Sequence, residues 1–192
     1  MAIKAVIFDC FGVLVASSEE SLFDVFPQHS EKLAKLHRDA NIGLVDKKGF
    51  LVGIKQITGM SIKEQTLHHY CNVDSRDVNK SALDWASQLK DSGKFKLGLL
   101  SNVGRGWLDN FLKINSVKGL FDVEILSGEV RMMKPDPKIF LHMAARLKVK
   151  PSECIMIDDR EDYIEGALLA GMQGIIFRST KQAKSELDKI LG

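Results

Sequence analysis

The sequence has few cysteines, no long apolar run and no marked excess of either charge. Its three cysteines, Cys10, Cys71 and Cys154, are odd in number and far apart. They fit neither a disulfide framework nor the spacing of a metal site, and they favour reduced thiols in a cytoplasmic protein. The adjacent His68 and His69 would point in different directions on a helix, so we expect no metal site there.

The remaining absences exclude further classes of protein. No segment approaches the ~18 consecutive apolar residues that a transmembrane helix needs. The apolar stretch near the N-terminus resembles a short export signal, but Asp9 in its middle argues against export, so we expect a soluble protein. Lys and Arg number 27 against 25 Asp and Glu, which gives no reason to expect a nucleic acid or a membrane as partner.

The sequence does contain enough apolar residues for a substantial core, 45% of 192 positions. Several segments are rich in aliphatic and β-branched residues, with no alternation of apolar and polar positions, and they predict strands. Such strands are typical of the middle of a parallel sheet covered on both faces. The segments are 2–9, 95–101, 153–158 and 174–177, with a weaker candidate at 121–126.

Helical patterns separate the later strands. Residues 136–149 repeat apolar side chains every four positions, and Asp136 and Pro137 suit the start of that helix. Residues 161–172 and 181–191 show similar patterns. The alternation of strand and helix predicts a doubly wound, Rossmann-like α/β fold with a parallel sheet.

Residues 16–92 interrupt this alternation. Helical patterns follow one another there without a convincing strand, and turn-like breaks occur at Pro27 and at 41–43. We therefore predict a small all-helical cap at 16–92, inserted directly after the first strand. The α/β core would then comprise residues 1–15 and 93–192.

Polar residues end three of the predicted strands. Asp9 ends the first strand, Ser101 and Asn102 end the second, and Asp158 and Asp159 follow the ECIMI run. In open parallel sheets, ligands bind beyond the carboxyl ends of the strands. We therefore expect these side chains to meet at one edge of the sheet.

These residue types suit phosphoryl chemistry. Asp9 can attack phosphorus or carbon as a nucleophile. Carboxylates that gather without His or Cys favour a hard, oxygen-bound cation, most simply Mg²⁺. Ser101, Asn102 and Lys134, a lysine ahead of a proline-rich turn, can hold phosphoryl oxygens.

Four segments carry the polar residues named above, and they are FDCFGVL, LLSN, MKPDPKIF and IDDREDYIEGALLAGM. With these four motifs, in this order and over essentially the whole chain, the sequence resembles the haloacid dehalogenase-like (HAD) superfamily. The predicted cap is similar to the small helical cap of the phosphatase-like subfamily IA, which is inserted after the first motif.

The resemblance implies a role for each matching position. Asp9 would form an aspartyl-phosphate, Ser101 would bind the phosphoryl oxygens, Lys134 would steady the nucleophile, and Asn102 would line the substrate pocket. The substrate would be a small phosphorylated metabolite such as a sugar phosphate. The enzyme would be a monomer or a homodimer.

The resemblance also implies a Mg²⁺ site. Asp159, with help from Asp158, would hold the ion together with Asp9, and the backbone carbonyl of Phe11 would contribute a further oxygen. Tyr163 stands where an Asp or Asn is common in the family, although Asp162 is next to it.

Phe11 is the main departure from the phosphatase pattern. Typical phosphatases of the family have an aspartate at this position, which protonates the leaving oxygen and then activates water. Phenylalanine can do neither, although general acid and base assistance contributes only roughly 10² to 10⁴ in rate. Its loss would slow such an enzyme without abolishing its activity.

Phe11 leaves two alternatives open. True haloacid dehalogenases have an aromatic residue at that position and need no metal, so a metal-independent 2-haloacid dehalogenase is one alternative. A catalytically weak or inactive protein that binds a phosphorylated ligand or a partner is the other. The cap would set the substrate, and its candidate contact residues are Ser17, Glu19, His29 and Arg38.

Overall fold

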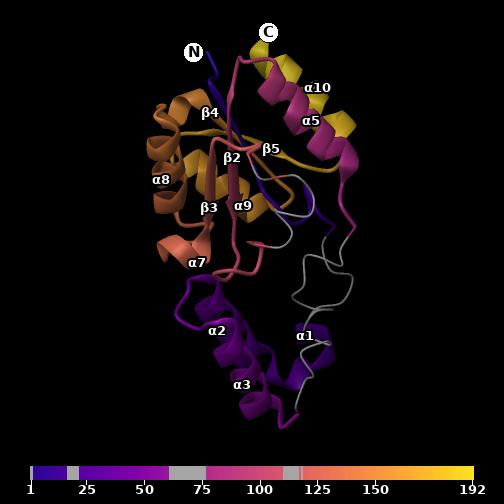
Figure 1. Cartoon of the computed structure of the whole chain (residues 1–192), viewed down its shortest axis with the longest axis vertical. Coiled ribbons are helices and arrows are strands. Elements are labelled where there is room, and N and C mark those ends of the chain that lie inside the picture. The colour runs from indigo at the N-terminus through magenta and orange to yellow at the C-terminus, as the bar shows by residue number, and fades with distance from the viewer. Residues whose placement is uncertain (1, 17–21, 61–76, 110–116, 118) are drawn as a thin grey trace.

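Five parallel strands form a single sheet, with β1 at its centre (Figure 1). The computed structural model describes residues 2–16, 22–60, 77–109, 117 and 119–192. The order β3-β2-β1-β4-β5 confirms the predicted doubly wound α/β fold, and the weaker strand candidate is the edge strand β3. The strands are β1 (Ala5–Phe8), β2 (Lys96–Ser101), β3 (Val123–Leu126), β4 (Cys154–Asp158) and β5 (Gln173–Ile176).

Helices cover both faces of the sheet, which explains why the central strand β1 is apolar and buried throughout. Val6 and Phe8 belong to the apolar cluster on the side of α5 and α10, whereas Ala5 and Ile7 belong to the cluster on the side of α8 and α9. Successive side chains of a strand point to opposite faces, so a strand covered twice must be apolar at every position. The helices are α5 (Lys80–Asp91), α8 (Pro137–Leu147), α9 (Glu161–Leu169) and α10 (Thr180–Leu191).

Local signals fix where these helices begin. The Asp136 side chain accepts a hydrogen bond from Lys138 N at 3.0 Å, and Pro137 occupies the first turn of α8. Ser179 and Gln182 form a reciprocal capping box at the start of α10. Within the described residues, no helix is both long and apolar enough to cross a membrane.

A group of short helices lies beyond the carboxyl ends of the strands, at the lower end of the molecule in Figure 1. These helices lie within the predicted cap and have a small apolar cluster of their own, which includes Leu33, Phe50 and Ile54. Residues 61–76 of the predicted cap lie outside the described residues. The elements are α1 (Leu22–Val25), the 3-10 helix η1 (Pro27–His29), α2 (Ser30–Asn41) and α3 (Lys47–Thr58).

Helix α5 lies on the sheet, although the sequence pattern predicts it within the cap at 16–92. Its residues Ala82, Trp85 and Ala86 belong to the apolar cluster of the sheet. The rings of Trp85 and Phe8 meet edge to face, with 5.3 Å between their centroids. We therefore propose that the cap ends before α5, near Asn79.

The cap contacts the core next to α7 (Ser127–Val130), the short helix that follows β3. Ser127 Oγ donates a hydrogen bond to the backbone oxygen of Asn41, at 2.5 Å. The rings of Phe50 and Trp107 pack edge to face, with centroids 5.3 Å apart. A polar and an aromatic contact thus join α2 and α3 to the loops at the carboxyl edge of the sheet.

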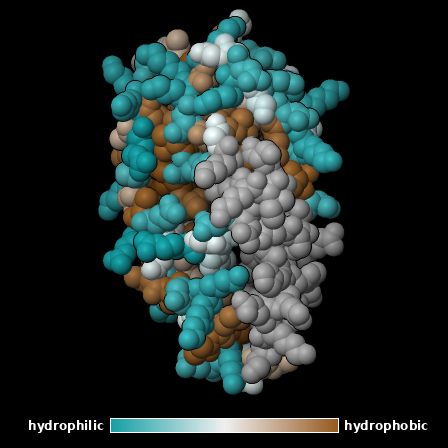
Figure 2. Space-filling model, viewed as in Figure 1, coloured by the Kyte–Doolittle hydropathy of each residue, from teal (hydrophilic) through white to brown (hydrophobic). Residues whose placement is uncertain are grey.

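The visible surface in Figure 2 is mostly hydrophilic, with separate hydrophobic areas on the core and the cap. Leu44, Leu168 and Leu169 are among the exposed large apolar side chains. Scattered apolar residues of this kind are normal on a protein surface. The choice between monomer and homodimer stays a prediction.

Candidate active site

The carboxyl ends of the three central strands bring polar side chains together, as the sequence predicts. Asp9 directly follows β1, where its N–H still donates to Ile157 O of β4 at 2.9 Å. Ser101 ends β2 and Asp158 ends β4, the two neighbours of β1 in the sheet. All three polar side chains are buried.

Lys134 joins two of these strand ends through its ammonium group. Its Nζ lies 2.8 Å from Asp9 Oδ1 and 2.6 Å from Asp158 Oδ2, and the side chain has no exposed surface. Burial alone would lower the pKa of Lys134, but the charges of Asp9 and Asp158 outweigh it and raise the pKa to about 12. The lysine is therefore a fixed positive charge beside Asp9.

Three carboxylates crowd around this point. Asp9, Asp158 and Asp159 each place an oxygen within 4.8 Å of the others. Burial, with the charge of Asp158 adding to it, raises the pKa of Asp9 to about 7 against the opposing charge of Lys134. The same two causes raise the pKa of Asp159. This cluster is therefore short of positive charge, and its hard oxygen donors suit a divalent cation.

Gly12 makes room for Asp159. Its φ is +81°, and a Cβ atom at this position would lie 2.3 Å from Asp159 Oδ2. Gly12 N–H donates to Val15 O at 2.7 Å, which closes the turn after Asp9. Any side chain at position 12 would displace the Asp159 carboxylate, which explains why a glycine occupies this position of the FDCFGVL segment.

Hydrogen bonds from two arginine residues hold the acidic pair. The backbone N–H of Arg160 donates to Asp158 Oδ1 at 3.1 Å. The Arg178 guanidinium donates to Asp159 O at 2.9 Å and to Glu161 Oε1 at 3.1 Å. Sequence reasoning missed Arg178, whose only signal is its place after the last predicted strand.

The hydroxyl of Ser101 is buried without a hydrogen-bond partner among the described residues. Its Oγ is the one buried side-chain polar atom in the described part of the chain that has no hydrogen-bond partner. A buried hydroxyl without a partner is costly, so native proteins rarely keep one without a functional reason. An anionic oxygen bound at the strand ends would satisfy it.

Asn102 and Tyr163 surround Lys134. Asn102 Nδ2 donates to Lys134 O at 2.8 Å and to the Tyr163 hydroxyl at 3.1 Å, and its Oδ1 accepts from Lys134 N at 2.9 Å. The centroid of the Tyr163 ring lies 4.8 Å from Lys134 Nζ and 4.4 Å from the guanidinium carbon of Arg160. The amide that sequence reasoning expected to line the substrate pocket is thus engaged with protein atoms.

Phe11 lies next to the carboxylate cluster in the sequence, whereas the candidate cap residues lie on other elements or outside the described residues. Phe11 is partly buried against the apolar cluster of the sheet, two positions after Asp9. His29 and Arg38 lie on η1 and α2, and their side chains make no hydrogen bond or ion pair with the strand-end residues among the described positions. Ser17 and Glu19 lie outside the described residues.

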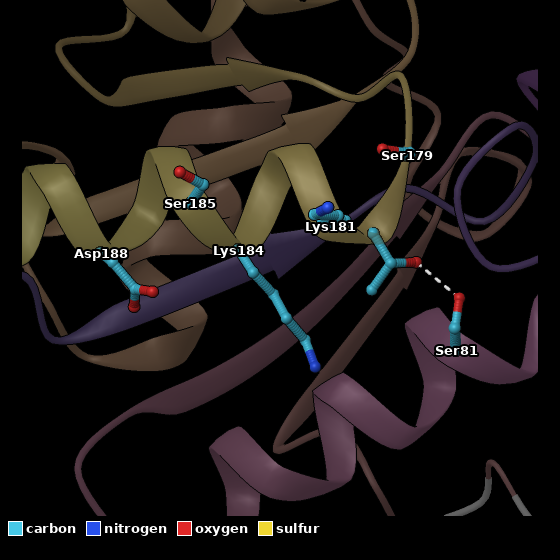
Figure 3. Close-up of a pocket in the computed structure, with 7 residues that line it drawn as sticks. Ser81, Ser179, Lys181, Lys184, Ser185 and Asp188 are labelled. Atoms are coloured by element: carbon cyan, nitrogen blue, oxygen red, sulfur yellow. Dashed lines mark hydrogen bonds between the residues drawn. The ribbon is translucent and has the colours of Figure 1, made fainter.

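A surface hollow of about 680 Å³ lies between α5 and α10, and none of the strand-end residues lines it. Figure 3 shows residues that line it, with the hydrogen bond between Ser81 Oγ and Thr180 Oγ1, 2.8 Å long, at its border. The N-terminus of α10 is already capped by Ser179. We therefore place the chemistry at the carboxylate cluster, where burial and charge coincide.

Comparisons with known proteins agree with this geometry. The family model of the haloacid dehalogenase-like hydrolases matches residues 3–171. Bifunctional epoxide hydrolase 2 of Rattus norvegicus is 33% identical over 125 residues, which are 62% of this chain and 22% of that protein. The match therefore spans about a fifth of that relative's length.

Two further relatives match over nearly their full length. Phosphorylated carbohydrates phosphatase of Thermotoga maritima is 25% identical over 197 residues, 96% of this chain and 90% of the relative. The crystal structure of a HAD family enzyme of Bacteroides thetaiotaomicron, a magnesium complex, is 25% identical with a TM-score of 0.77, over 91% of this chain and 93% of that one. The chain belongs to the haloacid dehalogenase-like hydrolases, and its relatives include phosphatases.

Proposed function

We propose that this hydrolase is a Mg²⁺-dependent phosphatase of a small phosphorylated metabolite, such as a sugar phosphate, with Asp9 as the nucleophile. The observation that carries the proposal is the buried ammonium of Lys134, held between Asp9 and Asp158 beside the third carboxylate of Asp159. The phosphatase among the relatives that acts on phosphorylated carbohydrates supports the substrate class.

The donor set fits a magnesium ion. Asp9, Asp158 and Asp159 would hold it, with the backbone carbonyl of Phe11 as a further oxygen ligand. The crowding that raises the pKa of Asp9 and Asp159 is relieved when a divalent cation is bound. When bound, Mg²⁺ neutralises charge on the phosphoryl group and lowers its repulsion from the carboxylates.

The side chains divide the reaction between them. A carboxylate oxygen of Asp9 forms a bond to phosphorus while the bond from phosphorus to the leaving oxygen breaks, which gives an aspartyl-phosphate. Lys134 keeps the Asp9 carboxylate oriented, and Ser101 Oγ donates a hydrogen bond to a phosphoryl oxygen. Water then attacks the phosphorus of the intermediate and releases phosphate and free Asp9.

Phe11 sets the limit on this mechanism. Its side chain cannot protonate the leaving oxygen or accept a proton from the attacking water. Both proton transfers then involve solvent or the substrate, so leaving groups of low pKa are favoured. We expect slow turnover on alkyl phosphates and faster turnover on activated aryl phosphates.

A metal-independent 2-haloacid dehalogenase is the second candidate, because Phe11 presents an apolar side chain and Asp9 can equally attack carbon. The cluster of three carboxylates argues against it, since these groups repel one another without a cation. A protein that binds a phosphorylated ligand without turning it over is the third.

Product release separates the three candidates. Phosphate release from sugar phosphates and p-nitrophenyl phosphate is measured with Mg²⁺ and with EDTA, beside chloride release from 2-haloacids, for the wild type and Asp9→Asn. We expect Mg²⁺-dependent phosphate release that Asp9→Asn abolishes. Phosphate release that survives Asp9→Asn contradicts the mechanism, and metal-independent chloride release favours the dehalogenase. A melting temperature that rises with a phosphorylated ligand, without either product, favours the binding protein.

A further inference from the structure

We propose that Tyr163 is a positioning residue, which fixes Lys134 through its ring and Asn102 through its hydroxyl. The inference rests on the proposed function, because it assigns Tyr163 a part in the reaction at Asp9. Its basis is a pair of distances: 4.8 Å from Lys134 Nζ to the ring centroid and 3.1 Å from Asn102 Nδ2 to the hydroxyl.

The ammonium group of Lys134 needs more than its two carboxylates. It has three N–H donors, and Asp9 and Asp158 provide the two ion-pair partners. The side chain has no exposed surface, so bulk water does not solvate it. The π face of Tyr163 attracts the buried cation without adding another negative charge to the carboxylate cluster.

The backbone of Lys134 is held from the same side. Asn102 Oδ1 accepts from Lys134 N, and Asn102 Nδ2 donates to Lys134 O, at 2.9 and 2.8 Å. The remaining amide hydrogen of Asn102 is directed to the Tyr163 hydroxyl. Tyr163 therefore contacts the ammonium of Lys134 directly and orients the amide that holds its main chain.

The ring itself is anchored by Arg160. The guanidinium carbon lies 4.4 Å from the ring centroid, and the guanidinium donates two hydrogen bonds to Asp162, at 3.0 and 2.8 Å. A bidentate pair of this kind fixes the plane of the guanidinium. The ring of Tyr163 thus has a defined position from which to act on Lys134.

The kinetic test compares Tyr163→Leu with Tyr163→Phe on p-nitrophenyl phosphate, well below the melting temperature of either variant. We expect Tyr163→Leu to lower kcat about tenfold with KM changed less than about twofold, because Lys134 loses the ring. Tyr163→Phe keeps the ring and should lose no more than about threefold in kcat. Leu169→Ala, on the exposed side of α9, is the control and should match the wild type. Wild-type kcat in Tyr163→Leu overturns the proposal.

A double-mutant cycle tests the hydroxyl contact without any turnover. Tyr163→Phe and Asn102→Ala are combined, and melting temperatures are measured without substrate. We expect Tyr163→Phe to lower the melting temperature by about 2–4 °C in the wild type and by less than about 1 °C in the Asn102→Ala background. Fully additive losses overturn the link through Asn102. If the wild type releases no phosphate, the proposed function fails. The double-mutant cycle then still tests the contact between Tyr163 and Asn102, because it needs no turnover.

Discussion

Two buried serines follow neighbouring strands and differ in their hydrogen bonding. Ser101 ends β2, and its Oγ has no partner in the described part of the chain. Ser127 follows β3, and its Oγ accepts from Val103 N at 2.8 Å and donates to Asn41 O. The two residues have the same size and burial, so they form a matched pair for separating function from stability.

Ser101→Ala is expected to raise the free energy of unfolding of the free protein by about 1 kcal/mol, because it removes an unpaired buried hydroxyl. Ser127→Ala is expected to lower it by about 1–3 kcal/mol, since it leaves buried backbone groups unpaired. Urea unfolding measures both. A loss of stability in Ser101→Ala as large as in Ser127→Ala would show that Ser101 has a structural partner. Only Ser101→Ala should also weaken phosphate release.

Phe11→Asp restores a group that can donate and accept a proton. We expect a gain in turnover on poor leaving groups such as sugar phosphates, by up to roughly 10²-fold, and little gain on p-nitrophenyl phosphate. The melting temperature should fall, because Phe11 packs against the apolar cluster of the sheet. Phe11→Leu is the control without a carboxyl group. Equal turnover in all three proteins would mean that the proton comes from elsewhere.

The sequence predicts strand-end residues better than it predicts the residues around them. Asp9 and Asp158 could be placed at one edge because apolar runs end at them and parallel strands share an edge. The contacts of Tyr163 and Arg178 could not be predicted. These contacts depend on how α9 and the end of β5 are oriented toward the MKPDPKIF segment. No spacing between residues in the sequence encodes that orientation.

Among the helices and strands, α5 is an element whose location the sequence does not predict correctly. Its apolar stripe, which includes Trp85, indicates that one face is buried. The stripe cannot indicate whether the buried face meets the cap or the sheet. The helical patterns before it continue without a strand, so the sequence predicts α5 as part of the cap. Strand β3 was only a weak candidate, because Glu124 interrupts its apolar run.

Asp122 connects α5 to the sheet, and its carboxylate is expected to contribute to the stability of this contact. It forms an ion pair with Lys90 of α5, and its Oδ2 accepts from Leu97 N at 2.7 Å. Partial burial acts to raise the pKa of Asp122, but the bonds from Lys90 and Leu97 hold the pKa below its ordinary value. A depressed carboxyl pKa stabilises the fold above the pKa of the unfolded chain, and this contribution disappears as the pH falls through the folded value.

Asp122→Asn should therefore lower the free energy of unfolding by about 1 kcal/mol at neutral pH. The difference from the wild type should shrink as the pH falls, and urea unfolding at about pH 7 and about pH 3 measures it. Asp91→Asn, on an α5 residue with no ion pair among the described positions, is the control. A difference that does not change with pH would mean that the carboxylate charge contributes nothing.

At the scale of the whole molecule, the backbone of Gly43, which follows α2, lies against Gly128 of α7. Gly43 follows α2 with φ +72°, and a Cβ atom there would lie 2.2 Å from Gly128 O of α7. Gly59 ends α3 with φ +73°, and a Cβ atom there would have nothing within 4 Å. Both glycines have a left-handed conformation that would strain any other residue, but only Gly43 has the core beside it.

Gly59→Ala should lower the free energy of unfolding by about 1 kcal/mol, which is the cost of the left-handed conformation alone. Gly43→Ala should cost about 2–4 kcal/mol, because it also separates α2 from α7. It should change KM for a substrate that the cap contacts, whereas Gly59→Ala should not. Thermal unfolding and KM measurements provide the comparison. Equal effects of the two variants would mean that the cap does not depend on this contact.

The positive charge of Lys134 also bears on the charge of the metal ion that would suit the carboxylate cluster under the proposed function. Three carboxylates and one ammonium, all ionised, leave two uncompensated negative charges. A sodium ion would leave the pocket anionic, and a trivalent ion would leave it cationic and slow to release phosphate. Under the proposed function, a divalent ion would make the pocket electrically neutral, so a phosphate dianion would meet no net repulsion on entry and no net attraction on departure.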